Sequence, residues 1–253
     1  MKLLPRIIPS LLLKNGGLVK GKNFKDHVYV GDPINAFRIF NDKEVDEICL
    51  LNISNDENNK IPFNLIEQIA SEAFMPFSYG GNINSIENVK RLINLGVEKV
   101  IFNSALYENK TLIKESVNLL GSSSVTVSID YKKNLFGKNK IFLNKKKKMS
   151  NLDLLDSCRL AESLGAGEII ACCVDKEGAM SGYDLKGIKD ISDEVKIPII
   201  ANGGASSLEC FKKAIDCGAS AASAGSFFVF RGRYKAVMIS YPGYKELYDL
   251  FDE

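Results

Sequence analysis

The sequence predicts a single (β/α)8 TIM barrel that spans residues 1–253 and is built from two half-barrel repeats. A length of 253 residues is the usual size of one such barrel, and a hydrophobic content of 45% is enough to build a large core. Residues 75–85 and 197–207 share one pattern, in which a proline and an apolar run precede a Gly-Gly pair and a serine. This pattern is typical of a buried strand that turns into a helix.

A second pair of similar stretches, 96–104 and 218–226, follows the first pair at the same spacing. Both spacings are close to half the chain. Two copies of a half-barrel unit explain them, and we therefore expect eight strands.

The strands are expected where short apolar runs meet turn residues, because parallel sheets bury both faces of their strands. The expected ranges are 6–13, 47–53, 77–79, 99–102, 125–129, 168–173, the run that opens at Ile197, and 219–224.

Helices are expected between these strands. Asp32 and Pro33 predict the first helix start, because aspartate caps a helix and proline suits its first position. Further helices are expected over 62–73, from 85, over 109–121 and 152–164, from 183–184, over 207–217 and over 234–251. Residues 131–150 are expected to form the longest connection, in which the charge run of Lys145 to Lys148 indicates a solvated loop, with phosphate binding as the alternative.

Composition excludes several classes of function. The net charge of +2 reflects balanced acids and bases, so we expect no nucleic-acid partner, no membrane-binding face and no membrane insertion. Six cysteines without a Cys-x-x-Cys pair indicate free thiols in a reducing compartment, which favours the cytoplasm. One histidine excludes a His-rich metal site, and we expect neither a metal nor a cofactor.

In a barrel of this kind, the active site lies at the carboxyl ends of the strands. Glycines there, followed by the first turn of a helix, present backbone N–H groups that suit phosphate, although tight packing turns would also use glycine. Two cradles should face each other and hold a substrate with a phosphate at each end. Their residues are Gly81, Asn82, Asn103, Ser104, Glu177, Gly178, Gly203, Gly204, Gly225 and Ser226.

Asp130 ends an apolar run, where an unpaired carboxylate is costly unless the site uses it. We therefore expect Asp130 to be a catalytic acid or base, with a purely structural carboxylate as the alternative. Asp175 and Lys20 are candidates to assist its proton transfers.

Several motifs resemble the cyclase subunit of imidazole glycerol phosphate synthase. The resemblance covers residues 6 to about 230 and includes Arg6-Ile7-Ile8-Pro9, Ser128-Ile129-Asp130, Ser181-Gly182-Tyr183-Asp184 and Ile200-Ala201-x-Gly203-Gly204-Ala205. It implies a barrel that receives ammonia from a separate glutaminase subunit and delivers it to a bisphosphorylated aminoimidazole carboxamide ribonucleotide, which is cleaved and cyclised.

The resemblance also implies two catalytic aspartates, one that ends the first strand and one that ends the fifth. Asp130 is the second, but Leu12 occupies the first position. Leucine cannot transfer a proton, and losing such a group typically costs about 10² to 10⁴ in rate. Other departures lie on the same face, at Asn52, Asn82, Cys172, Glu177 and Ala179.

The opposite end keeps the family pattern. The family guards its ammonia entrance with four charges, which are present here as Arg6, Glu47, Lys99 and Glu168. These charges could instead only stabilise the barrel through salt bridges. Residues 234–242 are similar to a branch associated with amidation of surface-polysaccharide sugars, which works beside a glutaminase and a separate sugar amidotransferase.

Three functions therefore remain open. The first is a barrel subunit that conducts ammonia from a docked glutaminase to a phosphorylated or nucleotide-linked acceptor in sugar amidation. The second is a working cyclase (a lyase) of histidine biosynthesis that relies on Asp130. The third is a scaffold for the glutaminase that has no ligand of its own.

Overall fold

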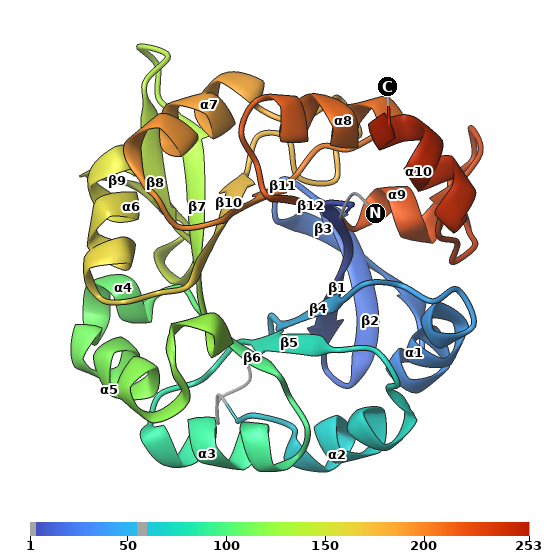
Figure 1. The fold of residues 1–253 in the computed structure, drawn as a ribbon, viewed down its shortest axis with the longest axis horizontal. Helices are drawn as coiled ribbons and strands as arrows, with labels where there is room; N and C mark the ends of the chain where they lie inside the picture. Colours follow the sequence, from blue (N-terminus) through green and yellow to red (C-terminus); the bar gives the residue numbers. More distant parts are fainter. Residues whose placement is uncertain (1–3, 55–59, 253) are drawn as a thin grey trace.

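The computed structural model describes residues 4–54 and 60–252, and it contains a closed barrel of eight parallel strands (Figure 1). The strands, in their order around the barrel, are β1 (Arg6–Lys14), β4 (Ile48–Asn52), β5 (Phe77–Gly80), β6 (Lys99–Phe102), β7 (Val125–Lys133), β10 (Glu168–Cys173), β11 (Ile199–Asn202) and β12 (Ala221–Ala224). β12 pairs with β1 through Arg6 and Ala221, so the sheet has no open edge within the barrel. The predicted (β/α)8 barrel is confirmed.

Helices surround this sheet as an outer ring (Figure 1). They are α1 (Pro33–Asn41), α2 (Phe63–Glu72), α3 (Ile86–Asn94), α4 (Ala105–Glu108), α5 (Lys110–Leu120), α6 (Leu154–Ser163), α7 (Leu185–Glu194), α8 (Leu208–Asp216), α9 (Ser226–Val229) and α10 (Tyr244–Asp252). Short 3-10 turns lie at Ser122–Ser124 and Asn144–Lys146.

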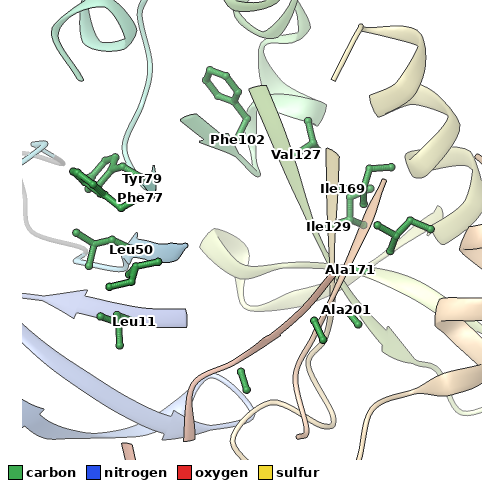
Figure 2. Packing of buried hydrophobic residues seen from close by; sticks show 14 of the residues in the cluster. Leu11, Leu50, Phe77, Tyr79, Phe102, Val127, Ile129, Ile169, Ala171 and Ala201 are labelled. Carbon is green, nitrogen blue, oxygen red and sulfur yellow. The ribbon is translucent and has the colours of Figure 1, made fainter. Parts of the chain in front are cut away.

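The main core lies between the sheet and the helices. Side chains alternate along each strand, so every second residue points outward into this layer. The residues labelled in Figure 2 belong to one buried cluster, and they are Leu11, Leu50, Phe77, Tyr79, Phe102, Val127, Ile129, Ile169, Ala171 and Ala201. Burying such side chains contributes roughly 1.5–3 kcal/mol each, which makes this layer the main source of stability.

The inward-pointing side chains form layers along the barrel axis. Four charged residues close the amino end, and a small apolar cluster lies above them, made of Ile8, Cys49, Ile101, Ile170, Ile200 and Ala221 with Leu51 packed against it. Polar side chains follow towards the carboxyl ends. Charge, apolar packing and polar chemistry therefore occupy different heights of one barrel.

The internal repeat is visible in the strand pairing. β5 pairs with β6 through Ser78 and Lys99, and β11 pairs with β12 through Ile200 and Ala221. β5 and β6 are the third and fourth strands around the ring, and β11 and β12 are the seventh and eighth. The two Gly-Gly turns therefore lie on opposite sides of the barrel mouth.

Two hairpins that were not among the expected strands extend the sheet. β2 (Gly17–Lys22) and β3 (Lys25–Gly31) form an antiparallel hairpin attached to β1. β8 (Asn139–Leu143) and β9 (Lys148–Asp153) follow the end of β7 as antiparallel strands. The expectation of one continuous loop over 131–150 is therefore wrong, because residues 139–143 and 148–150 pair as strands, although Lys145 to Lys148 are exposed as expected.

The expected helix over 234–251 is wrong in its first part. β13 (Phe230–Arg231) and β14 (Ala236–Val237) form a small ribbon there, and α10 begins only at Tyr244. Pro242 disfavours a helical residue before it. Tyr241 instead stacks on Phe228 and donates a hydrogen bond to the carbonyl oxygen of Ile7.

The helix expected over 109–121 is confirmed as α5, and a separate short helix, α4, precedes it. α4 ends at Glu108, and Asn109 has an extended φ of −150° that interrupts the helix. The Asn109 side chain accepts a hydrogen bond from the backbone N–H of Leu112 and so caps α5.

Candidate functional site

Asp130 lies inside the barrel near the carboxyl end of β7, and 8% of its surface is exposed. The amide nitrogen of Asn103 donates a hydrogen bond to Asp130 Oδ2 at 3.0 Å and another to the carbonyl oxygen of Ser128. Burial raises the pKa of Asp130 to about 7, the Asn103 bond opposes this rise, and the charge of Glu177 adds to it. A carboxyl group with such a pKa can both donate and accept a proton near neutral pH.

Lys20 forms a buried ion pair beside this carboxyl group. Its side chain is 1% exposed, and its ammonium nitrogen lies 3.1 Å from Oε1 of Glu177. β2, which pairs with β1, supplies Lys20, and the turn after β10 supplies Glu177, so segments from strands that are not neighbours in the barrel meet at its mouth. The backbone N–H of Asn23 also donates to the Glu177 carbonyl oxygen at 2.8 Å, which ties the β2–β3 turn to the same place.

Most of the residues expected in the second phosphate cradle line a single cavity. It is lined by Glu177, Gly178, Met180, Gly204, Ala205, Ala224, Gly225 and Ser226. Two of its glycines allow close approach of the backbone. A Cβ atom at Gly225 would lie 1.9 Å from the ammonium nitrogen of Lys20, and one at Gly204 would lie 2.3 Å from a backbone oxygen of Gly182. The Lys20 ammonium group therefore lies beside Gly225, where it is paired with Glu177, a residue that lines the same cavity.

Gly203 adjoins this cavity and has a φ of +90°, a conformation that glycine adopts without strain. Met180, Ala205 and Ala224 were not identified from the sequence. Ala224 could have been found from its place before Gly225, but Met180 carries no signal in its residue type.

The first expected cradle lies across the mouth, at the ends of β5 and β6. Gly81 has a φ of +113°, and a Cβ atom there would lie 2.2 Å from the backbone oxygen of Asn52. Asn82 has a φ of +60°, which asparagine tolerates better than most residues. Ser104 precedes α4, whereas the side chain of Asn103 is committed to Asp130. To bind phosphate, Asn103 would therefore have to use its backbone N–H group.

Asp175 lies at the outer side of the mouth, where its side chain is 34% exposed. Its carboxylate accepts a hydrogen bond from the backbone N–H of Lys133 and pairs with the ammonium group of Lys132 at 3.2 Å. These contacts hold Asp175 against the β7–β8 hairpin, so a role in proton transfer would require it to leave them.

Asn202 is a further polar residue of the mouth that sequence reasoning missed. β-sheet register places Asp130, Cys172 and Asn202 side by side on β7, β10 and β11. The Asn202 amide nitrogen lies 3.4 Å from the Cys172 sulfur, and its carbonyl oxygen is buried without a hydrogen-bond partner among the described residues. Burial raises the pKa of the Cys172 thiol well above its usual value, which keeps the thiol protonated. Counting register from Asp130 could have found Asn202.

Leu12 faces the barrel interior from β1. It is paired in register with Leu51, which packs on the interior apolar cluster, and it is half-buried. No titratable group is available at this position of β1. Of the two positions where the resemblance implies an aspartate, only the one on β7 therefore carries a carboxylate, that of Asp130.

The four charges at the amino end form a continuous ring. Arg6 binds both Glu47, at 2.6 Å, and Glu168. Lys99 also binds both carboxylates, at 3.1 Å and 3.0 Å. Each positive group touches two negative groups, so the expected set of four is brought together across the barrel axis.

Residues 4–54 and 60–252 contain no group of three or more His, Cys, Asp or Glu side chains that could hold a metal ion. Within the same residues, no helix is long and apolar enough to cross a membrane. All six cysteines are free thiols, and four of them are buried.

Comparison with known proteins agrees with the resemblance in the motifs. The model of the family described as histidine biosynthesis protein matches residues 6–235. A protein of Leptospira interrogans with the provisional name imidazole glycerol phosphate synthase subunit HisF is 42% identical over 250 residues, which cover 98% of both chains. Imidazole glycerol phosphate synthase subunit HisF of Petrotoga mobilis is 40% identical over 233 residues, which cover 91% of this chain and 92% of the relative. Both are similar to this chain over nearly its whole length.

Proposed function

Because the chain belongs to the histidine biosynthesis protein family, and within it to the relatives of imidazole glycerol phosphate synthase subunit HisF, we propose that it is the barrel subunit of a glutamine-dependent complex. A glutaminase docks at the amino end of the barrel and releases ammonia there. The barrel then conducts the ammonia to a phosphorylated acceptor at its mouth.

The observation that carries this proposal is the separation of the two ends. The ring of Arg6, Glu47, Lys99 and Glu168 follows the family pattern and is fully paired. At the mouth, Leu12 occupies the position where the family resemblance implies a catalytic aspartate. A chain that keeps its entrance but loses one proton-transfer group fits ammonia delivery better than the complete cyclase reaction.

We further propose that the acceptor belongs to the amidation of a surface-glycan sugar, with a separate sugar amidotransferase as a possible third component. Support comes from Leu12 and from residues 234–242, whose sequence is similar to the branch with that association. The cavity lined by Gly178, Gly204 and Gly225 is where we place the phosphate group of such an acceptor, because glycine turns followed by a helix present backbone N–H groups.

A working cyclase of histidine biosynthesis is the second candidate. The observation that favours it is Asp130, whose pKa of about 7 allows one group to act as acid and as base in turn. The Lys20 ammonium group, 3.1 Å from Glu177 Oε1, would stabilise the negative charge of groups at the mouth. In this case Asp130→Asn should abolish turnover.

The first experiment is a cyclase assay on the purified chain with ammonium salt and the bisphosphorylated aminoimidazole carboxamide ribonucleotide. Wild type, Leu12→Asp and Asp130→Asn are compared, and substrate binding is followed in parallel by thermal stabilisation. The proposal predicts little or no turnover by wild type, and a gain of about 10² or more in Leu12→Asp, because the aspartate restores a proton-transfer group.

The outcomes separate the candidates. Efficient turnover by wild type that is lost in Asp130→Asn would replace the proposal with the cyclase. Absence of thermal stabilisation by any phosphorylated compound would favour a scaffold that only binds the glutaminase. Substrate binding with turnover only in Leu12→Asp would support a cyclase-type barrel reassigned to ammonia delivery.

A further inference from the structure

The β7–β8 hairpin ends in a tip that holds two large apolar side chains in water. Leu135 and Phe136 are 101% and 86% exposed, and they are adjacent in the turn. In Figure 1 the paired ends of β7 and β8 extend beyond the ring of helices. Exposed leucine or phenylalanine is ordinary when isolated, but a neighbouring pair on a projecting turn marks a candidate contact surface.

The tip is ordered by its own hydrogen bonds. The side-chain oxygen of Asn134 accepts from the backbone N–H groups of Phe136 and Lys138, each at 2.9 Å. The backbone of Asn134 donates to the Lys138 carbonyl oxygen and accepts from Gly137, which has a φ of +74°. The turn therefore presents Leu135 and Phe136 in a fixed conformation, and a binding partner would not need to order it.

The hairpin is also the most basic part of the chain. Residues 131–152 contain eight lysines, no arginine and no acidic residue, which leaves the rest of the chain net acidic despite the overall charge of +2. The balanced composition therefore conceals a local excess of positive charge. The eight are Lys132, Lys133, Lys138, Lys140, Lys145, Lys146, Lys147 and Lys148.

Four of these lysines are partly neutralised by carboxylates behind the tip. Lys132, Lys133, Lys140 and Lys145 pair with Asp175, Asp184, Asp153 and Glu108 at 3.1–3.4 Å. Among the described residues, the other four form no ion pair, and Lys138 is the one at the tip itself. The tip thus combines an apolar end with a cation at its side, whereas Lys146, Lys147 and Lys148 lie in the β8–β9 turn at the other end of β8.

From this arrangement we propose that the tip of the β7–β8 hairpin is a docking surface for an anionic lipid bilayer, in which Leu135 and Phe136 enter the interface while Lys138 contacts lipid headgroups. Apolar side chains bordered by lysine are the combination that binds anionic membrane surfaces. A protein partner is disfavoured, because protein interfaces are enriched in arginine and depleted in lysine, whereas this segment uses lysine alone. The proposal does not depend on the identity of the ammonia acceptor.

The sequence contains no tryptophan, so one substitution creates a unique reporter. Phe136→Trp is titrated, as the full chain, with vesicles of phosphatidylcholine alone and with vesicles that also contain phosphatidylserine. We expect a blue shift of the emission with the anionic vesicles only, because the indole leaves water there. Phe74→Trp is the matched control, since Phe74 is 91% exposed on the α2–β5 connection, and its emission should not change.

Co-sedimentation with the same vesicles measures affinity. Leu135→Ser combined with Phe136→Ser should weaken binding by at least about 10-fold, because both apolar groups are removed from the interface. Lys138→Gln should weaken it by about 5-fold, and added salt should weaken it further. Both sites are exposed, so circular dichroism should show unchanged folding.

The proposal is overturned if the emission of Phe136→Trp is insensitive to anionic vesicles, which is also the result expected of a protein-docking tip. It is equally overturned if the double serine variant binds as wild type does, or if Phe74→Trp and Phe136→Trp respond alike.

Discussion

Asp130 carries its carboxyl group inside the barrel, where the Asn103 amide donates a hydrogen bond to it and little water reaches it. Burial raises the pKa of Asp130 from 3.8 to about 7. Between these two pH values the folded chain keeps a proton that the unfolded chain has lost. The contribution of Asp130 to stability is therefore fully present below pH 3.8 and is lost as pH rises through about 7.

Asp130→Asn should remove this dependence on pH. Asparagine keeps an oxygen that can accept the Asn103 hydrogen bond, but it carries no charge that burial could penalise. At about pH 8 we expect the free energy of unfolding of the variant to exceed that of wild type by up to about 4 kcal/mol, because each pKa unit corresponds to about 1.4 kcal/mol. At about pH 4 the two proteins should differ little. Urea unfolding at both pH values measures the difference.

Asp175→Asn is the control for this prediction. Asp175 is about one-third exposed and pairs with Lys132 at the surface, so its loss should change stability by less than about 1 kcal/mol. A pH profile of Asp130→Asn that matched wild type would mean that Asp130 is solvated and not buried.

At the scale of elements, the two half-barrel repeats offer a comparison of two helix starts. Ser85 precedes α3, and its hydroxyl oxygen accepts a hydrogen bond from the backbone N–H of Asn88 at 3.2 Å. Ser207 holds the same place before α8, but its side chain forms no capping hydrogen bond. The sequence predicts a cap at both positions, and the structure has one only at the first.

Ser85→Ala should therefore lower the free energy of unfolding by about 1 kcal/mol, which is typical for the loss of a capping hydroxyl. Ser207→Ala should lower it by much less, because no capping bond is lost. Thermal unfolding of the two variants beside wild type tests the difference. Equal losses in both variants would show that residue type at this position, and not the hydrogen bond, sets the stability of the helix start.

Apolar runs and turn residues were sufficient to predict the barrel strands and most of the helices. The ranges 99–102 and 168–173 match the structure at both ends. The hairpins β2–β3 and β8–β9 could not be predicted in the same way. Their residues are mostly polar, and they are held as strands by backbone pairing with β1 and β7, which composition does not report.

The candidate site could be predicted at the level of strand ends and glycine turns. Asp130, Lys20 and the glycines around Gly204 do meet at the mouth. Local sequence could not predict that Asn103 turns its side chain to Asp130, or that Lys132 holds Asp175 outside. Both contacts join residues that are distant in sequence and depend on how neighbouring strands end.

At the scale of the whole molecule, the ring of four charges joins segments from both halves of the barrel. Arg6 opens β1, Glu47 directly precedes β4, Lys99 opens β6, and Glu168 opens β10. Glu47 and Glu168 are 4% and 8% exposed, so their charges are poorly solvated. The ring therefore also acts as a clamp at the amino end, whether or not ammonia passes through it.

Lys99→Met tests this clamp, because it removes the cation that contacts both carboxylates and leaves Arg6 to pair with two nearly buried negative charges. We expect the free energy of unfolding to fall by about 2 kcal/mol, since breaking a buried ion pair costs far more than an exposed one gives. Arg38→Met is the control, because Arg38 pairs with Glu72 where both side chains are at least one-third exposed, and its loss should cost less than about 1 kcal/mol. Urea unfolding compares the two variants. A Lys99→Met chain as stable as Arg38→Met would contradict the clamp, and the ring would then be explained by its contacts with a partner alone.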